Sequence, residues 1–159
     1  MIKVGDTVPA HKLTAATADG PKEVTTQELF TGKKVVLFAV PGAFTPTCSA
    51  RHLPGFVENL DALMAKGVDT VACVAVNDVF VMTAWTKSQN VDERMMMLAD
   101  GSGTFTKALG LELDLTARGL GIRSQRYAMV VEDGRVTHLA VEPPGGFEVS
   151  RAESVLAVL

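Results

Sequence analysis

The sequence predicts an α/β fold in which helices cover both faces of a central mixed β-sheet. Two apolar runs, at residues 35–40 and 71–76, have the length and the β-branched content of buried strands. A helical pattern separates them, as expected for parallel strands that need a crossover connection. An Asp-Gly turn at 133–134 lies between two further strand-like runs and predicts an antiparallel hairpin. Together these observations indicate one sheet with parallel and antiparallel parts.

The remaining elements follow in order along the chain. Those expected before the second buried strand are an extended entry at 5–10, a turn at 19–21, a short capped helix at 25–30, the strand Lys34–Val40 and a helix from Cys48 to Gly67. Those expected later are the strand 70–76, a helix capped by Asn77 and Asp78, a strand at 95–99, a helix at 104–109, the hairpin 127–132 and 135–141, and a helix at 150–159. This order is a thioredoxin-like arrangement, and we expect a single domain over residues 1–159.

One segment of this plan contains a conflict. Pro54 and Gly55 fall within two turns of Cys48, inside the expected helix 48–67. Proline removes a backbone donor and clashes with the preceding turn, so the helix should be weak at this point.

Composition excludes several classes of function. The net charge of −3 and the absence of a basic stripe argue against nucleic acid or an anionic membrane as the main partner. The longest apolar runs have six residues, whereas about 18–20 are needed to cross a bilayer. The first residues, MIKVGD, lack the apolar core of a secretory signal. Two cysteines make no disulfide scaffold, so we expect a reducing compartment, the cytoplasm.

Cys48 is the most informative residue of the chain. It follows a buried strand and a loop shaped by two prolines and a glycine, and it stands where a helical pattern begins. Free N–H groups and the dipole at a helix start favour an anion, and thiolate is the reactive form of cysteine. The alternative interpretation is a small buried hydrophobic residue, but the placement favours chemistry.

Other residues near Cys48 in the sequence have two possible uses each. The Thr45 hydroxyl either caps a turn or hydrogen-bonds the sulfur, and spacing leaves both open. His52, four residues after Cys48, could form a metal pair or a thiol–imidazole pair with it. Two ligands make no zinc site and a cysteine protease needs a third group, so His52 is interpreted mainly as a local structural residue. A cationic partner for the thiolate is expected among four arginines, namely Arg51, Arg118, Arg123 and Arg126. Arg126 opens the strand 127–132 and so sits on a rigid element. Cys73 lies within a continuous apolar strand and is expected to be buried and inert.

The segment Pro41-Gly42-Ala43-Phe44-Thr45-Pro46-Thr47-Cys48 resembles the peroxidatic-cysteine loop of peroxiredoxins, whose core is P-x-x-x-T-x-x-C. The Gly-Ala-Phe form, followed by HLPGF at 52–56, is similar to the Prx5 subfamily, also called type II or atypical peroxiredoxins. Segments 71–78, 98–101 and 126–134 agree with the same subfamily, and the likeness extends from Val4 to Pro143.

The resemblance implies a role for each matched residue. Cys48 would be the peroxidatic nucleophile, Thr45 would hydrogen-bond its sulfur and the substrate oxygen, Arg126 would stabilise the thiolate, and Pro41 would shield the pocket. Family members reduce hydrogen peroxide and alkyl hydroperoxides without a metal or flavin cofactor, and similar proteins form non-covalent homodimers. The tail beyond Glu142 has no resolving cysteine, which implies a one-cysteine mechanism. The external thiol would be glutathione with glutaredoxin, with thioredoxin as the other option.

Two rival functions use the same features. A thiol redox sensor would relay oxidation of Cys48 to a partner without peroxidase turnover. A thioredoxin-fold binding module would carry an inert thiol. Multiple-turnover peroxide consumption separates the first rival from a peroxidase, and a sulfenic-acid probe separates the second.

Overall fold

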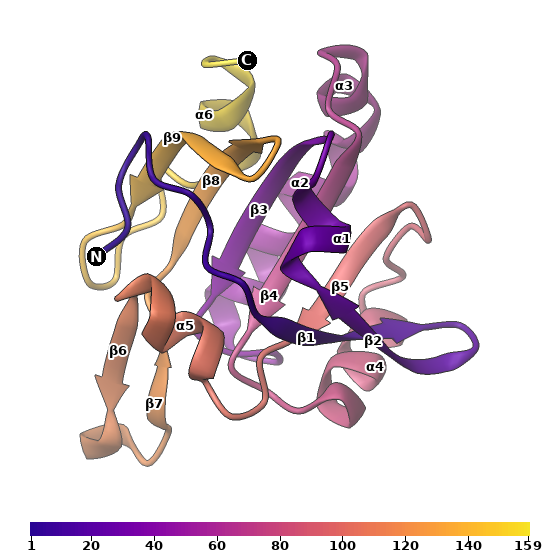
Figure 1. Cartoon of the computed structure of the whole chain (residues 1–159). Coiled ribbons are helices and arrows are strands. Elements are labelled where there is room, and N and C mark those ends of the chain that lie inside the picture. Colours follow the sequence, from indigo (N-terminus) through magenta and orange to yellow (C-terminus); the bar gives the residue numbers. More distant parts are fainter.

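The chain folds around a seven-stranded sheet with the strand order β2-β1-β5-β4-β3-β8-β9 (Figure 1). A computed structural model describes all residues from Met1 to Leu159. The strands of this sheet are β1 Lys12–Thr17, β2 Gly20–Thr25, β3 Lys34–Val40, β4 Thr70–Ala75, β5 Met95–Ala99, β8 Tyr127–Glu132 and β9 Arg135–Val141. Strands β3, β4 and β5 are parallel, and β1, β2, β8 and β9 join them in antiparallel fashion. The expected mixed sheet is confirmed.

Helices cover both faces of this sheet, also as expected. They are α1 Thr26–Phe30, a π-helix η1 Cys48–His52, α2 Leu53–Glu58, α3 Leu60–Ala65, α4 Val79–Ser88, α5 Thr104–Leu109, a short 3₁₀ turn η2 Thr116–Arg118 and α6 Ala152–Leu156. Buried side chains of α2, α3, α4 and α6 belong to one core cluster, and those of α1 and α5 belong to the other. No helix is both long enough and apolar enough to cross a membrane.

The two cores lie on opposite faces of the interior strand β3. Val36 and Phe38 point into the cluster that also contains Cys48, whereas Val35 and Leu37 point into the opposite cluster. All of these side chains are completely buried. Successive residues of a strand face opposite sides, so a strand buried on both faces has a continuous apolar sequence. This explains the apolar run that predicted the strand. The cysteine loop follows the carboxyl end of β3.

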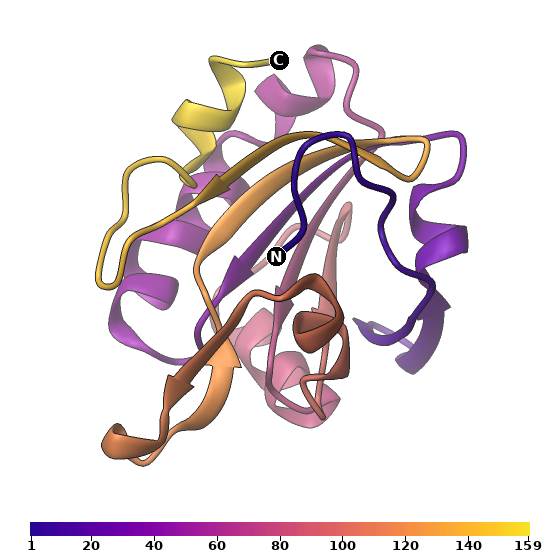
Figure 2. The same cartoon turned by 60° about the vertical axis from the view of Figure 1, so that its left-hand side comes forward.

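Two short hairpins were not predicted. Only a turn was expected near Gly20, but residues 12–25 form the β1–β2 hairpin. A second hairpin, β6 Glu112–Leu115 with β7 Gly121–Ser124, forms a separate two-stranded sheet. Figure 2 shows this hairpin standing out from the body of the molecule. Both hairpins contain strands with many exposed residues, so they lack the apolar pattern that reveals a buried strand.

The expected long helix from Cys48 to Gly67 is wrong in detail. The segment is divided into η1, α2 and α3, with Asn59 between the last two. Helical residues run without a break from Pro46 to Glu58, so Pro54 lies inside a continuous helix, and its missing N–H falls where η1 changes to α2. The expected last helix, 150–159, is likewise shorter, because α6 is confined to Ala152–Leu156.

Candidate active site

The loop after β3 is tightly constrained at its start. A Cβ added at Gly42 would lie 3.1 Å from the Thr45 methyl carbon and 3.4 Å from Arg123 Nη1, so this position has little room for a side chain. The Ala43 N–H donates to Asn77 Oδ1 at 2.9 Å, which ties the loop to the end of β4. Phe44 adopts a φ of 62°, a strained value for a residue other than glycine. The loop is therefore a fixed scaffold for the residues that follow it.

Cys48 begins the π-helix η1 and is completely buried. Its carbonyl accepts a hydrogen bond from the Leu53 N–H, five residues ahead, which is the spacing of a π-helix. The next residue, Ser49, accepts a hydrogen bond from the Trp85 indole N–H at 2.9 Å. The cysteine backbone is thus fixed by its own helix and by α4.

Arg126 contacts the sulfur of Cys48 across 78 positions of sequence. Its Nη2 donates to Cys48 Sγ at 3.1 Å. Arg126 immediately precedes β8, whose first residue pairs with Ala39 near the end of β3, so it lies at the end of the sheet from which the cysteine loop leaves. Of the four arginines considered from the sequence, this is the one whose guanidinium reaches the thiol. A guanidinium stays charged at all relevant pH values and can stabilise a thiolate at this distance.

The other three arginines have different contacts. Arg123 donates to the carbonyls of Leu120 and Val76. Arg51 stacks over the Phe147 ring, with its guanidinium carbon 4.7 Å from the ring centre. Arg118 is exposed on η2, at the tip of the β6–β7 hairpin.

Thr45 does not make the expected contact with sulfur in this structure. Its hydroxyl donates to the Gly42 carbonyl at 2.6 Å, and no hydrogen bond joins it to Cys48. A hydroxyl has one proton to donate, so the Gly42 carbonyl and the sulfur compete for it. The Gly42 carbonyl takes the proton in this structure, and the hydroxyl oxygen keeps its capacity to accept a hydrogen bond.

His52 proves to be part of the site. Its Nδ1 lies 2.8 Å from Arg126 Nη1, and its Nε2 lies 3.0 Å from the Ser150 carbonyl oxygen. Burial, together with the nearby positive charge of Arg126, lowers the pKa of His52 to about 3. The ring is therefore neutral at physiological pH.

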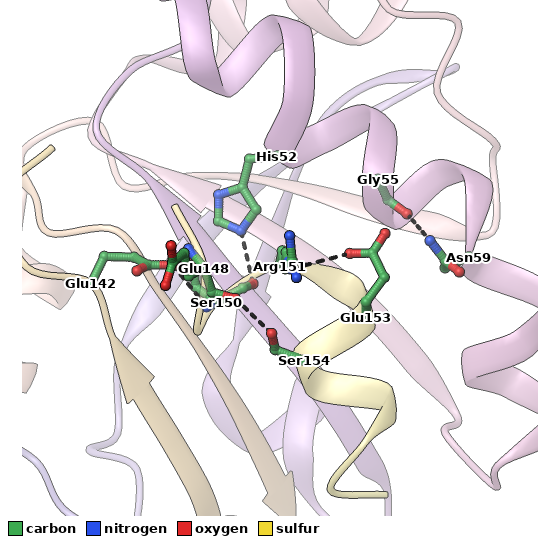
Figure 3. A network of polar contacts seen from close by, with 9 residues as sticks. All are labelled: His52, Gly55, Asn59, Glu142, Glu148, Ser150, Arg151, Glu153 and Ser154. Carbon is green, nitrogen blue, oxygen red and sulfur yellow. Dashed lines mark hydrogen bonds and ion pairs between the residues drawn. The ribbon is translucent and has the colours of Figure 1, made fainter. Parts of the chain in front are cut away.

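The C-terminal segment contacts His52 through the Ser150 carbonyl, and the buried carboxylate of Glu142 holds this segment in place (Figure 3). Glu142 Oε2 accepts from the backbone N–H of Ser150 at 2.8 Å, from its hydroxyl at 2.7 Å and from the Glu148 N–H at 2.7 Å. Burial opposes ionisation of Glu142, but these hydrogen bonds outweigh it and lower the pKa of the carboxyl. Sequence reasoning missed His52, Glu142 and Ser150 as partners. The one available signal was the position of His52 four residues after Cys48.

A cleft of about 490 Å³ opens beside these residues. Three segments line it: residues 41–47 of the cysteine loop, residues 113–126 of the β6–β7 hairpin region, and residues 142–146 after β9. Pro41, Thr45 and Arg126 are all in its wall, whereas the buried Cys48 does not line it. Arg126 is therefore the residue that both faces the cleft and contacts the thiol.

Cys73 lies in β4, on the same side of the sheet as Cys48, and the two thiols are not joined. It is completely buried, and burial raises the pKa of its thiol. No three His, Cys, Asp or Glu side chains are grouped as metal ligands.

Comparison with known proteins gives a consistent result. The Redoxin family model matches residues 3–156. Peroxiredoxin-2C of Oryza sativa is 51% identical over 161 residues, covering 99% of this chain and 98% of the relative. The chloroplastic Peroxiredoxin-2E of Arabidopsis thaliana is 50% identical, covering 99% of this chain and 69% of the relative.

Solved structures agree with these relatives. Reduced Prx3 from Vibrio vulnificus in complex with H₂O₂ superimposes with a TM-score of 0.94 at 57% identity, covering 99% of both chains. Peroxiredoxin 5 from Alvinella pompejana gives a TM-score of 0.87 at 36% identity, covering 99% of this chain and 97% of the other. The chain therefore belongs to the redoxin family and is a peroxiredoxin of the Prx5 (type II) group, a thiol-dependent peroxidase.

Proposed function

We propose that this protein reduces hydrogen peroxide and alkyl hydroperoxides at Cys48. The observation that carries the proposal is the Arg126 Nη2–Cys48 Sγ contact of 3.1 Å beside the cleft. The thiolate attacks one peroxide oxygen, so that an S–O bond forms while the O–O bond breaks. The leaving oxygen takes a proton and departs as water or an alcohol, and Cys48 becomes a sulfenic acid.

Arg126, Thr45 and Pro41 have distinct parts in this proposal. Arg126 stabilises the thiolate and the charge that develops as the O–O bond breaks. The Thr45 hydroxyl donates to Gly42, so we assign its oxygen the role of accepting the O–H of the bound peroxide. Pro41 presents no N–H and keeps water from the reacting atoms at the cleft wall.

An external thiol completes the cycle. It attacks the sulfenic acid, water leaves, and a mixed disulfide forms that a second thiol then reduces. Cys73 is a poor internal candidate, because it is completely buried in β4. We propose glutathione with glutaredoxin as the donor, with thioredoxin as the competing donor.

A bulky reductant reaches Cys48 only after the surrounding helix opens, since the residue is 0% exposed. Pro54 lacks an N–H at the junction of η1 and α2, which weakens the ladder of backbone hydrogen bonds there. Pro54→Ala should therefore slow reduction of the sulfenic acid more than its formation. An equal effect on both steps, measured in separate half-reactions, would contradict this gating role.

The decisive experiment is a steady-state peroxidase assay of the wild type and Cys48→Ser against a panel of thiol donors. The wild type should turn over many times, fastest with glutathione and glutaredoxin, and Cys48→Ser should be inactive. Full activity in Cys48→Ser would refute the assignment. Stoichiometric oxidation of Cys48 without turnover on any donor would favour the thiol redox sensor instead.

We also propose that the protein forms a non-covalent homodimer. Phe80 at the start of α4 is 76% exposed and Phe44 in the cysteine loop is 55% exposed. The hydrogen bond from Ala43 to Asn77 brings the two segments together, so these rings lie at the same end of the sheet. Phe80→Glu should shift the mass found by light scattering toward a monomer. Val158→Glu, at an apolar residue of the C-terminal segment that is 50% exposed, is the control.

Two unpaired cysteines are consistent with a reducing location, and we propose the cytoplasm. Fractionation of cells that produce the protein at its natural level tests this. Recovery in an organelle, as the name of the chloroplastic relative indicates for that protein, would overturn it.

A further inference from the structure

His52 is a buried titratable residue that no step of the proposed reaction uses. It lies at the end of η1, four residues after Cys48, and is completely buried. Rings of Phe38, Phe56 and Phe147 surround it, with centroid distances of 5.0, 5.6 and 5.2 Å. These contacts fix the plane of the imidazole, so its two nitrogen atoms point in defined directions.

The two neighbours of the ring require one particular tautomer. A carbonyl oxygen only accepts, so the contact with the Ser150 carbonyl requires a proton on Nε2. A guanidinium only donates, so the contact with Arg126 Nη1 requires a free lone pair on Nδ1. The ring must therefore be the neutral Nε2–H form, in agreement with its depressed pKa of about 3. A protonated ring would place two donors against each other.

The two terminal nitrogens of the Arg126 guanidinium connect His52 to the Cys48 thiol. Nη1 donates to His52 at 2.8 Å and Nη2 donates to Cys48 at 3.1 Å. The guanidinium is planar and rigid, so fixing one nitrogen restricts the other. Without an acceptor at His52 Nδ1, the side chain is free to turn toward the open cleft that it lines.

The far side of the ring is anchored as well (Figure 3). Ser150 is held by Glu142 through its N–H and its hydroxyl. The Glu142 N–H in turn donates to the Arg126 carbonyl at 2.9 Å. The chain of contacts therefore runs from Arg126 through His52 and Ser150 to Glu142 and back to the Arg126 backbone. A closed network of hydrogen bonds of this kind restrains its residues more than the same contacts would if each were made separately.

We propose that His52 is a positioning residue for peroxide reduction, which aims the Arg126 guanidinium at Cys48 by accepting a hydrogen bond at Nδ1. The role extends the proposed peroxidase function and rests on it. His52 itself touches neither the sulfur nor the substrate in this scheme. It ties the reactivity of the thiol to the C-terminal segment that holds the other side of the ring.

A matched pair of variants separates this role from simple packing. In His52→Asn the amide oxygen takes the place of Nδ1, so the acceptor for Arg126 remains and the Ser150 bond is lost. In His52→Gln the amide nitrogen takes the place of Nε2, so the Ser150 bond remains and the acceptor is lost. We expect His52→Asn to react with peroxide within about threefold of the wild type, and His52→Gln to be slower by about tenfold. Equal rates in the two variants would overturn the proposal.

Two further measurements do not need turnover. Alkylation of Cys48 by iodoacetamide in the Cys73→Ala background should show the same order, and the difference between the two variants should vanish once Arg126 is also replaced by alanine. A difference that persists without Arg126 would contradict the positioning role. Failure of the wild type to consume peroxide would refute the function while leaving this alkylation test valid.

The wild type itself provides a test if a variant does not fold. Nitrogen-15 shifts of the His52 ring should report the neutral Nε2–H tautomer throughout pH 5–8. A proton on Nδ1, in either a neutral or a charged ring, is incompatible with the hydrogen bond from Arg126 and would overturn the proposal.

Discussion

Replacing Arg126 with alanine removes both hydrogen bonds of its guanidinium while leaving the loop that carries Cys48 in place. The contact that matters for the reaction is Nη2 to Sγ at 3.1 Å. A hydrogen bond to a charged group contributes about 1.5–3 kcal/mol. At about 1.36 kcal/mol per factor of ten, its loss from the transition state should lower the second-order rate constant with peroxide by about 10–150-fold.

The assay is competition for a limiting amount of hydrogen peroxide between the reduced protein and a second peroxidase of known rate constant. Arg126→Lys keeps the charge but not the fork, so it should fall between alanine and wild type. Arg135→Ala, an exposed arginine on β9, is the control for loss of one positive charge. A rate for Arg126→Ala within threefold of the wild type would show that the observed contact does not assist the reaction.

Three other outcomes follow from the buried groups. Cys73→Ala should keep peroxidase turnover with an external thiol within about twofold, and a large loss would reveal a resolving role for this buried thiol. Glu142→Gln replaces a carboxylate by a neutral amide and weakens the three hydrogen bonds that it accepts, at a cost of about 2 kcal/mol in folding free energy. The melting temperature should therefore fall by about 4–8 °C, whereas the control Glu148→Gln, at an exposed side chain, should melt like the wild type. The pKa of His52 is about 3 in the folded chain against an ordinary 6.5, so the unfolded state binds the extra proton and stability falls as pH drops from 6.5 toward 3. Between pH 7 and 4.5, the free energy of unfolding measured with urea should fall by about 2–3 kcal/mol more for the wild type than for His52→Asn. The same pH dependence in both proteins would exclude this titration.

The predictable parts of this molecule were those with a strong local signal. The strand 34–40 is apolar because both of its faces are buried, and the loop to Cys48 is marked by proline and glycine. Arg126 was one of four candidate cations, distinguished by its place at the start of a strand and assigned by the resemblance, and the pairing of β8 with β3 brings it to the thiol. In each case the sequence signal lies within, or next to, the strand or loop that it predicts.

The other features depend on competition that the sequence does not reveal. Thr45 has two acceptors within three residues, Gly42 on one side and Cys48 on the other, and geometry decides between them. The bond from His52 to Ser150 joins positions 98 apart, in a C-terminal segment with no strong pattern. The β1–β2 hairpin was not predicted, because the edge strand β2 has few buried residues and therefore no alternation of apolar and polar residues.

The hydrogen bond between Trp85 and Ser49 gives the molecule an optical property. Trp85 is the only tryptophan of the chain and is completely buried. Its indole N–H donates to the hydroxyl of Ser49, the residue after Cys48. Indole emission responds to the polarity around the ring and to its hydrogen bond. Loosening of η1 during the reaction cycle should therefore change the intrinsic fluorescence, so the unlabelled protein carries its own real-time signal for each step at Cys48.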